Sequence, residues 1–167
     1  MTLEQLNQLT AQDAESEFLK CCGSQAWAQA MAASRPFTTE EELFADAEDA
    51  STSLTDEDWL QAFRAHPKIG EQKAAAGQTQ QEANWSAHEQ SGMQAAATDT
   101  LARLARGNRE YEAKFGFIFI VCASGKSSDE MLAILNDRLK SDLQTELRVA
   151  AKEQQKITRL RLEKLLN

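Results

Sequence analysis

One segment of this chain has the composition of a buried β-strand, and no second segment is available to pair with it. Residues 115–123, FGFIFIVCA, combine aromatic and β-branched side chains. A lone strand would leave its backbone N–H and C=O groups without partners, because a neighbouring strand normally supplies those bonds. We therefore interpret this segment as a buried helix or a helix with an irregular end. The fold class that follows is all-α.

Helix start and stop signals cover the rest of the chain. Such signals are a Ser or Thr followed three residues later by Glu or Gln, a closing Gly, or a Pro that the helix cannot pass. With ordinary helix lengths they predict one domain over residues 1–167 with about seven to nine helices. The predicted starts and stops are 11–22 closed by Gly23, a helix capped by Ser24, a box of Thr38 with Glu41, a connection over 46–53, a helix capped by Thr55 that ends near Pro67, a short helix or loop within 70–84, and boxes of Ser86 with Glu89, Ser127 with Glu130 and Ser141 with Gln144.

The charge balance excludes one class of function. The chain carries 26 acidic and 18 basic residues, a net charge of −8, whereas a nucleic-acid binder needs a basic surface. We expect no nucleic-acid partner. No apolar stretch is long enough to cross a bilayer, and the first residues do not resemble a signal peptide, so we expect no membrane association and a cytoplasmic location. Two histidines and three scattered cysteines show no ligand spacing, so we also expect no metal site.

His66 is the first candidate for chemistry. It lies at the end of a predicted helix, where the negative end of the helix dipole favours a protonated imidazole. Pro67 forces an extended backbone before it, so the ring should project away from the helix. A general acid or base would suit this position. A histidine that simply ends the helix explains it equally well, and His88, in the first turn of the next predicted helix, reads as a surface side chain.

The predicted helix start at Ser86 is the second candidate. Glu89 has an ordinary role there as the third residue of a capping box. Alternatively, the unpaired N–H groups of this helix start could bind a carboxylate or carbonyl, with Ser86, Glu89 and Gln90 adding polar contacts.

The last predicted helix places an arginine on its core face. The spacing three, four, three, four continues through the positions that should meet the core, which are Leu147, Ala150, Gln154, Ile157, Arg161 and Leu165. Arg159 should point to solvent. Arg161 must then reach water along its own stem, form a structural salt bridge or bind an anion.

Six segments together resemble the family of OHCU decarboxylases, where OHCU is 2-oxo-4-hydroxy-4-carboxy-5-ureidoimidazoline. Each motif is weak alone, but their order and spacing match over nearly the whole chain. The segments are the pattern from Phe18 to Phe37, HPKIG at 66–70, WSAHEQ at 85–90, YEAKFGF at 111–117, FIVCASGKS at 119–127 and KITRLRL at 156–162. The chain departs from the family at Ile118, where Pro is common, and at Ser124, where several relatives carry a basic residue.

The resemblance implies cofactor-independent decarboxylation of OHCU to (S)-allantoin in urate and purine catabolism, by a homodimer. It implies His66 as the catalytic acid with Glu89 beside it. The implied substrate-binding residues are Pro67, Ser86, Glu89, Gln90, Phe119, Ile120, Val121, Cys122, Ala123 and Arg161. In this mechanism the conjugated ring of the substrate accepts the electrons released with carbon dioxide, and His66 or its hydrogen-bonded partner delivers one proton.

Two other functions remain open from the sequence. The chain could be a non-catalytic helical interaction module, in which His66 only ends a helix. It could also be a hydrolase that acts on a related ureide. The first alternative predicts that His66, Glu89 and Arg161 do not converge on one pocket, and substrate turnover distinguishes the second.

Overall fold

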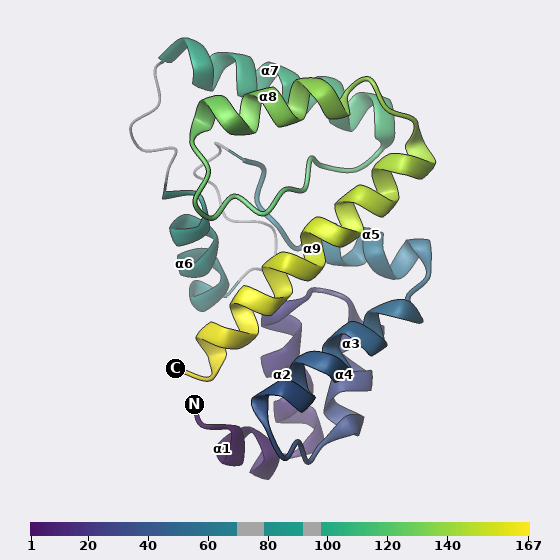
Figure 1. The fold of residues 1–167 in the computed structure, drawn as a ribbon, viewed down its shortest axis with the longest axis vertical. Helices are drawn as coiled ribbons and strands as arrows, with labels where there is room; N and C mark the ends of the chain where they lie inside the picture. Colours follow the sequence, from purple (N-terminus) through teal and green to yellow (C-terminus); the bar gives the residue numbers. More distant parts are fainter. Residues whose placement is uncertain (70–78, 92–97) are drawn as a thin grey trace. The chain divides into compact units, whose positions relative to one another are not determined.

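The computed structural model describes residues 1–69, 79–91 and 98–167. Over these ranges the chain forms nine helices and no strand (Figure 1). The helices are α1 (Leu3–Gln8), α2 (Ala11–Cys21), α3 (Gln25–Ser34), α4 (Glu40–Thr52), α5 (Asp56–Arg64), α6 (Gln80–Glu89), α7 (Thr98–Phe115), α8 (Ser128–Arg138) and α9 (Leu143–Leu165). The predicted all-α fold class is confirmed. Among the described helices, none combines the length and the apolar character needed to cross a membrane.

The helices group into two compact units. Unit 1 contains residues 1–62 and 155–167, and unit 2 contains residues 63–154. The long helix α9 begins in unit 2 and ends in unit 1. The expectation of one domain over residues 1–167 stays a prediction.

Unit 1 is built around aromatic side chains of α2 and α3. Phe18 and Trp27 are fully buried, and their rings meet edge to face with centroids 6.0 Å apart. The Trp27 indole N–H donates to the Ala47 carbonyl of α4 at 3.1 Å, which satisfies the one polar atom of the ring.

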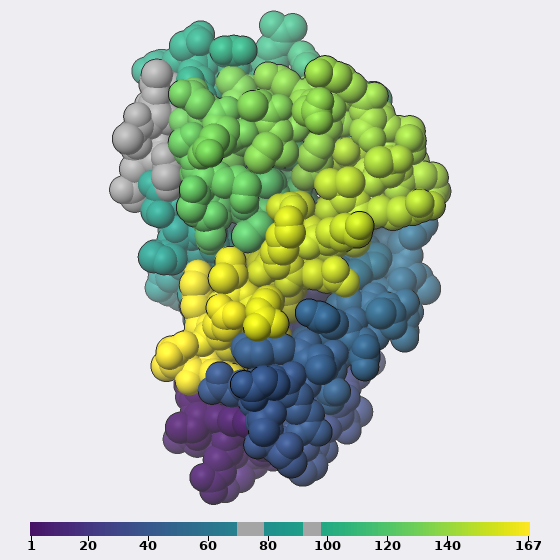
Figure 2. Space-filling view, viewed as in Figure 1, coloured from purple at the N-terminus to yellow at the C-terminus, as the bar shows by residue number. Residues whose placement is uncertain are grey.

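The end of α9 also belongs to unit 1. The N-terminal amine donates to the Leu165 carbonyl at 2.7 Å, so the two ends of the chain lie together (Figure 1). The Arg159 guanidinium lies over the Phe44 ring of α4 at 4.3 Å, and the C-terminal residues cover part of the surface of this unit (Figure 2). Arg159 is half exposed and pairs with Glu163, which confirms its predicted solvent-facing position.

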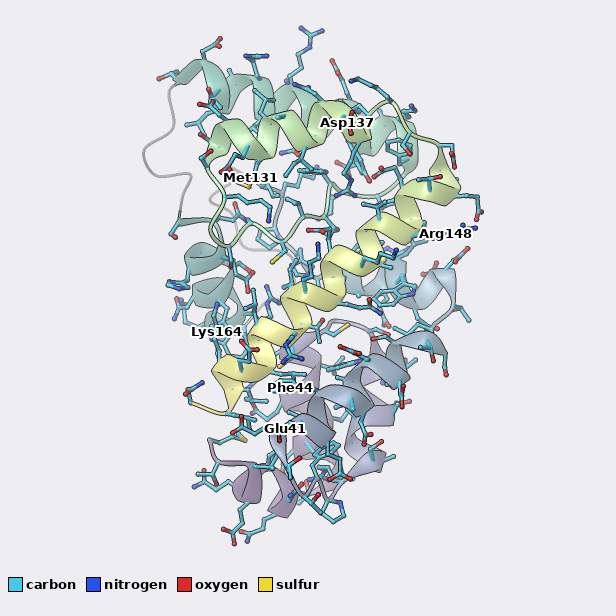
Figure 3. The ribbon with its side chains drawn as sticks, in the orientation of Figure 1. Glu41, Phe44, Met131, Asp137, Arg148 and Lys164 are labelled. Carbon is cyan, nitrogen blue, oxygen red and sulfur yellow. The ribbon has the colours of Figure 1, made fainter. Side chains whose placement is uncertain are left out.

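In unit 2, α7 and α8 lie side by side (Figure 1). Gly107 allows the close approach, since a Cβ atom added there would stand 2.6 Å from Leu135 Cδ2. The two faces of α8 differ strongly: the Met131 side chain is fully buried and the Asp137 side chain is 83% exposed (Figure 3). An amphipathic helix of this kind gains its stability by burying one face against its neighbour.

Several predicted helix starts are confirmed. Ser24 caps α3, Ser127 and Glu130 form the capping box of α8, and Thr55 accepts from the Asp58 N–H at the start of α5. Helix α2 ends at Cys21, before Gly23, as the sequence predicts.

Other predicted boundaries are wrong by a small shift. The cap of α4 is Thr39, which accepts from the Glu42 N–H, and the helix continues to Thr52 through the predicted connection 46–53. The start of α9 is capped by Asp142 instead of Ser141, because its carboxylate accepts from the Thr145 N–H at 2.9 Å. Adjacent polar residues can all act as caps, so the sequence pattern alone did not choose among them.

The start of α1 was not predicted, although Thr2 and Gln5 form a capping box there. The predicted helix opened by Ser86 is a larger error. Thr79 and Glu82 form the capping box in that region, and Ser86 lies inside α6. The positions 93, 96 and 97 assigned to that predicted helix lie outside the described residues.

The strand-like segment is neither a helix nor a strand. Helix α7 ends at Phe115, and Gly116 adopts a left-handed conformation with φ of +80° that closes it. The backbone of residues 117–123 then runs without regular structure, with Phe117 and residues 119–123 buried. The predicted irregular helix end is confirmed, and the predicted buried helix is wrong.

Candidate active site

His66 lies in a short loop that follows α5. Helix α5 ends at Arg64, and the His66 N–H donates to the Phe63 carbonyl at 3.1 Å. Pro67 follows at once, so the backbone leaves the helix direction here as the sequence predicts. His66 and Pro67 are each half-buried.

The loop that carries His66 is tied to α7 at two points. The Asn108 side-chain amide donates to the Ile69 carbonyl at 2.8 Å, and Lys68 forms an ion pair with Glu112 at 2.6 Å. Asn108 and Glu112 stand one helical turn apart, so they contact the loop from one face of α7. Ile69 is itself buried. These contacts hold the loop on a rigid element.

The His66 ring makes a close polar contact with α9. Its Nε2 atom lies 2.7 Å from Oε1 of Gln154, a side chain with no exposed surface. An amide oxygen only accepts hydrogen bonds, so Nε2–H is the donor in this pair. The sequence placed Gln154 on the core face of the last helix but assigned it no role. A fully buried amide on an apolar face is the signal that could have identified it, because such a group needs polar partners.

Helix α6 presents three of the predicted site residues on one face. Ser86 and Glu89 are buried and Gln90 is half-buried, whereas His88 is exposed. Positions i, i+3 and i+4 of a helix share a face, which explains the grouping. The interpretation of His88 as a surface residue is confirmed.

Glu89 cannot be an N-terminal cap, because it is the last residue of α6. The predicted helix start at Ser86 is therefore wrong, and Gln90 is the C-terminal cap of the same helix, whereas the binding role of Ser86, Glu89 and Gln90 stays a prediction. A carboxylate at a helix C-terminus faces the negative end of the dipole and is disfavoured by roughly 0.3–1 kcal/mol. Burial adds a further cost for a charged group.

The segment 119–123 is held by side chains instead of by a neighbouring strand. The Cys122 N–H donates to the Glu153 carboxylate at 2.7 Å, and the Lys126 ammonium donates to the Cys122 carbonyl at 2.7 Å. Arg138 donates to the Ile120 carbonyl through Nη1. Buried backbone groups must find partners, and for three of these groups the partners are Glu153 of α9, Arg138 of α8 and Lys126.

Arg138 is fixed by a buried cluster. Its Nε donates to the Glu146 carboxylate at 2.8 Å, and its Nη2 donates to the Tyr111 hydroxyl at 3.1 Å. The Tyr111 hydroxyl donates to Glu146, and the Arg138 guanidinium also lies 4.8 Å from the centre of the Phe119 ring. Burial raises the pKa of the Tyr111 hydroxyl well above its usual range. The sequence did not predict that Tyr111, Arg138 and Glu146 form a cluster.

Electrostatics places Glu89 near the same segment. Burial raises the pKa of the Cys122 thiol, and the carboxylates of Glu153 and Glu89 add to the rise while Lys126 opposes it. Unit 2 therefore brings the end of α6 close to the irregular segment. In the same unit the His66 ring contacts α9 through Gln154. The residue before Gln154 is Glu153, which accepts from the Cys122 N–H.

Arg161 belongs to unit 1. Only 3% of its surface is exposed, and its Nη1 donates to the Lys20 carbonyl at 3.3 Å. The guanidinium lowers the pKa values of the buried thiols of Cys21 and Cys22, although desolvation dominates and raises both. The predicted core-facing position of Arg161 is confirmed. Over the described residues, no group of three or more His, Cys, Asp or Glu side chains is arranged to hold a metal ion.

Comparisons with known proteins give a consistent result. The OHCU decarboxylase family matches residues 7–163 of this chain. The uric acid degradation bifunctional protein TTL of Arabidopsis thaliana is 37% identical over 92% of this chain and 47% of its own length. The chain thus spans about half the length of that relative. The 2-oxo-4-hydroxy-4-carboxy-5-ureidoimidazoline decarboxylase of Haloferax volcanii is 29% identical over 97% of this chain and 94% of its own.

A solved structure is similar over almost its whole length. A crystal structure of OHCU decarboxylase in the presence of (S)-allantoin shares 40% sequence identity with this chain, covers 90% of it and 96% of the crystallised chain, and has a TM-score of 0.77. The family match extends over the motifs that carry the candidate site. The chain therefore belongs to the OHCU decarboxylase family.

Proposed function

We propose that this protein decarboxylates 2-oxo-4-hydroxy-4-carboxy-5-ureidoimidazoline to (S)-allantoin without a cofactor, as a step of urate degradation. The observation that carries the proposal is the 40% identity, over 96% of its chain, to an OHCU decarboxylase crystallised in the presence of (S)-allantoin. The position of His66 at the end of α5, in a loop held by α7 and α9, supports it.

The chemistry asks little of the protein beyond placement. Loss of carbon dioxide leaves an electron pair that the conjugated ring of the substrate accepts, so one proton delivered to one face completes the reaction. We assign that proton transfer to His66, whose loop is held on α7 and α9. General acid catalysis of this kind typically contributes on the order of 100- to 10,000-fold.

Glu89 would orient the carboxylate and hydroxyl of the substrate together with His66. Ser86 and Gln90 share its helix face and would add polar contacts. The backbone and side chains of residues 119–123 would exclude water, which strengthens electrostatic interactions in the site. Pro67 would shape the pocket beside His66, and the substrate-binding role that the resemblance implies for Arg161 stays a prediction.

The test is product formation by the purified protein, with His66→Ala compared with His88→Ala. Freshly prepared substrate should yield carbon dioxide and optically active allantoin, whereas the spontaneous reaction gives the racemate. His66→Ala should lose at least about 100-fold in kcat. His88→Ala removes the exposed histidine of α6 and should behave as the unmodified protein. Normal turnover by folded His66→Ala would remove His66 from the mechanism, and a hydrolysed ureide as product would favour the hydrolase.

The role of Glu89 is tested by comparing it with Glu82, which belongs to the capping box of α6. Glu89→Gln keeps the shape of the side chain and removes the carboxylate that the proposed mechanism uses, so kcat should fall in the folded protein. Glu82→Gln weakens the capping box that Glu82 makes with the Thr79 N–H at 2.6 Å. That variant should lose stability and keep normal turnover. The reverse pattern would show that Glu89 is structural.

The predicted homodimer and cytoplasmic location remain part of the proposal. Light scattering coupled to size-exclusion chromatography measures the mass of the assembly directly, against 18.5 kDa for one chain. A single-chain mass at micromolar concentration would contradict the dimer, and cell fractionation tests the location.

A further inference from the structure

We propose that Gln154 is a positioning residue that holds neutral His66 as the Nε2–H tautomer, so that Nδ1 is the nitrogen that gains and loses the proton. This inference rests on the proposed role of His66. It concerns a residue of α9 that the sequence motifs of the site do not include.

The geometry of the pair fixes which nitrogen carries the proton. The distance of 2.7 Å between His66 Nε2 and Gln154 Oε1 is that of a short hydrogen bond. The amide oxygen has no proton to give, so this bond exists only while Nε2 is protonated. Nε2–H is present both in the imidazolium and in this neutral tautomer. Titration of the ring therefore takes place at Nδ1.

Gln154 is well placed to impose this constraint. It has no exposed surface and stands between Ala150 and Ile157 on the buried face of a long helix. Its neighbour Glu153 accepts from the Cys122 N–H at 2.7 Å. Consecutive residues of α9 thus hold the His66 ring and the irregular segment 119–123, which would keep the acid and the pocket wall in register.

A neutral amide suits this task better than a carboxylate. A carboxylate at the same distance would raise the imidazole pKa and hold the ring charged. An amide orients the ring and selects the tautomer without adding charge. The charged groups on the surrounding elements are Arg64 of α5, Lys68 of the same loop, Glu89 of α6, Glu112 of α7 and Glu153 of α9. These groups are the same in every variant of residue 154. Differences in the tautomer or pKa of His66 among those variants are therefore due to residue 154.

The first measurement determines the tautomer of His66 in the unmodified protein. The chain has only two histidines, so long-range proton–nitrogen NMR spectra of the labelled protein resolve both rings, and His88→Ala assigns them. At a pH where His66 is neutral, its Nε2 should be protonated and its Nδ1 should not. Neutral His66 found as the Nδ1–H tautomer would overturn the proposal.

Two variants then test the effect on the reaction. Gln154→Leu removes the acceptor at similar volume and should leave His66 as a mixture of tautomers, with kcat lower by about 10- to 100-fold and KM nearly unchanged. Gln154→Glu should raise the pKa of His66 by about one unit or more. Since protonated His66 is the proposed acid, the loss of kcat at high pH should move upward by the same amount. Gln144→Leu, at an exposed position of α9, is the matched control.

The outcomes separate the two proposals. An unchanged tautomer and an unchanged pH profile of kcat in both variants would remove the role of Gln154 even if His66→Ala is inactive. If His66→Ala remains active, the proposed catalytic role fails, while the NMR spectra still decide which nitrogen is protonated. Should Gln154→Leu not fold, the spectra of the unmodified protein and the titration of Gln154→Glu decide the question alone.

Discussion

Removal of Glu146 should destabilise the protein strongly and disturb the segment 119–123 as well. Glu146 is 1% exposed and accepts hydrogen bonds from both Arg138 and Tyr111. Glu146→Ala leaves the Arg138 guanidinium, 8% exposed, as an uncompensated charge in the interior. Breaking such a pair costs about 3–5 kcal/mol. For a chain of this size that corresponds to a fall in Tm of about 6–20 °C.

The matched control is an ion pair on the surface of the same unit. Arg106 and Glu110 lie 2.8 Å apart with side chains 77% and 51% exposed, so Glu110→Ala should cost no more than about 1 kcal/mol. Urea unfolding followed by circular dichroism measures both variants. Equal losses for Glu146→Ala and Glu110→Ala would refute the reasoning that the buried cluster carries this energy.

A third variant separates stability from function. Replacing Tyr111 with Phe, Arg138 with Met and Glu146 with Leu together removes every charge from the cluster and keeps much of its volume. Such replacements often restore stability, so the triple variant should unfold at a higher urea concentration than Glu146→Ala. It still lacks the donor to the Ile120 carbonyl. We expect its kcat to stay low, and full activity would show that the bond from Arg138 to the Ile120 carbonyl is not needed for turnover.

Three further predictions concern the fold. Gly107→Ala should lower the free energy of unfolding by about 1–2 kcal/mol, because the added methyl group meets Leu135. In a Leu135→Ala background the same change should raise it, and urea titrations of the unmodified protein, the two single variants and the double variant will show both effects. Burial raises the pKa of the Cys22 thiol to about 11 from 9.0, so the free energy of unfolding should fall by up to about 3 kcal/mol as pH rises from 9 to 11. Over that range Tm should fall less steeply in Cys22→Ala than in the unmodified protein. Parallel slopes of Tm against pH would contradict the raised pKa of Cys22. Thr79→Ala should cost about 0.5–2 kcal/mol by removing the cap of α6, measured by thermal unfolding, and an unchanged Tm would argue against that cap.

Local signals in the sequence predicted the helices well. A capping side chain bonds to a backbone N–H three residues away, so Ser24, Thr55 and Ser127 act as caps whatever surrounds them. The periodic spacing of apolar residues likewise placed Arg161 on a buried face. Where two adjacent residues could serve, as at Thr38 and Thr39, the pattern gave the helix but missed its first residue by one.

The same local logic failed for Ser86 and Glu89. Their spacing is that of a capping box, yet it is also the spacing of two neighbours on one helix face, and only the position of Thr79 decides between the two. The error matters, because a buried carboxylate at a helix C-terminus has a different meaning from a cap at a helix start.

The sequence by itself determined that the chain is helical, that it carries the motifs of the OHCU decarboxylase family and that His66 stands at the end of a helix before a proline. Those features depend on residues close together in the chain. The tertiary structure was needed to show that residues 117–123 form no helix, and that Arg138 and Glu153 bind the Ile120 carbonyl and the Cys122 N–H from 18 and 31 residues away. It also decided that Gln154 bonds to His66 across 88 residues. Contacts between distant residues depend on which helix faces meet, and the periodic spacing of apolar residues shows that a face is buried but not which other face it contacts.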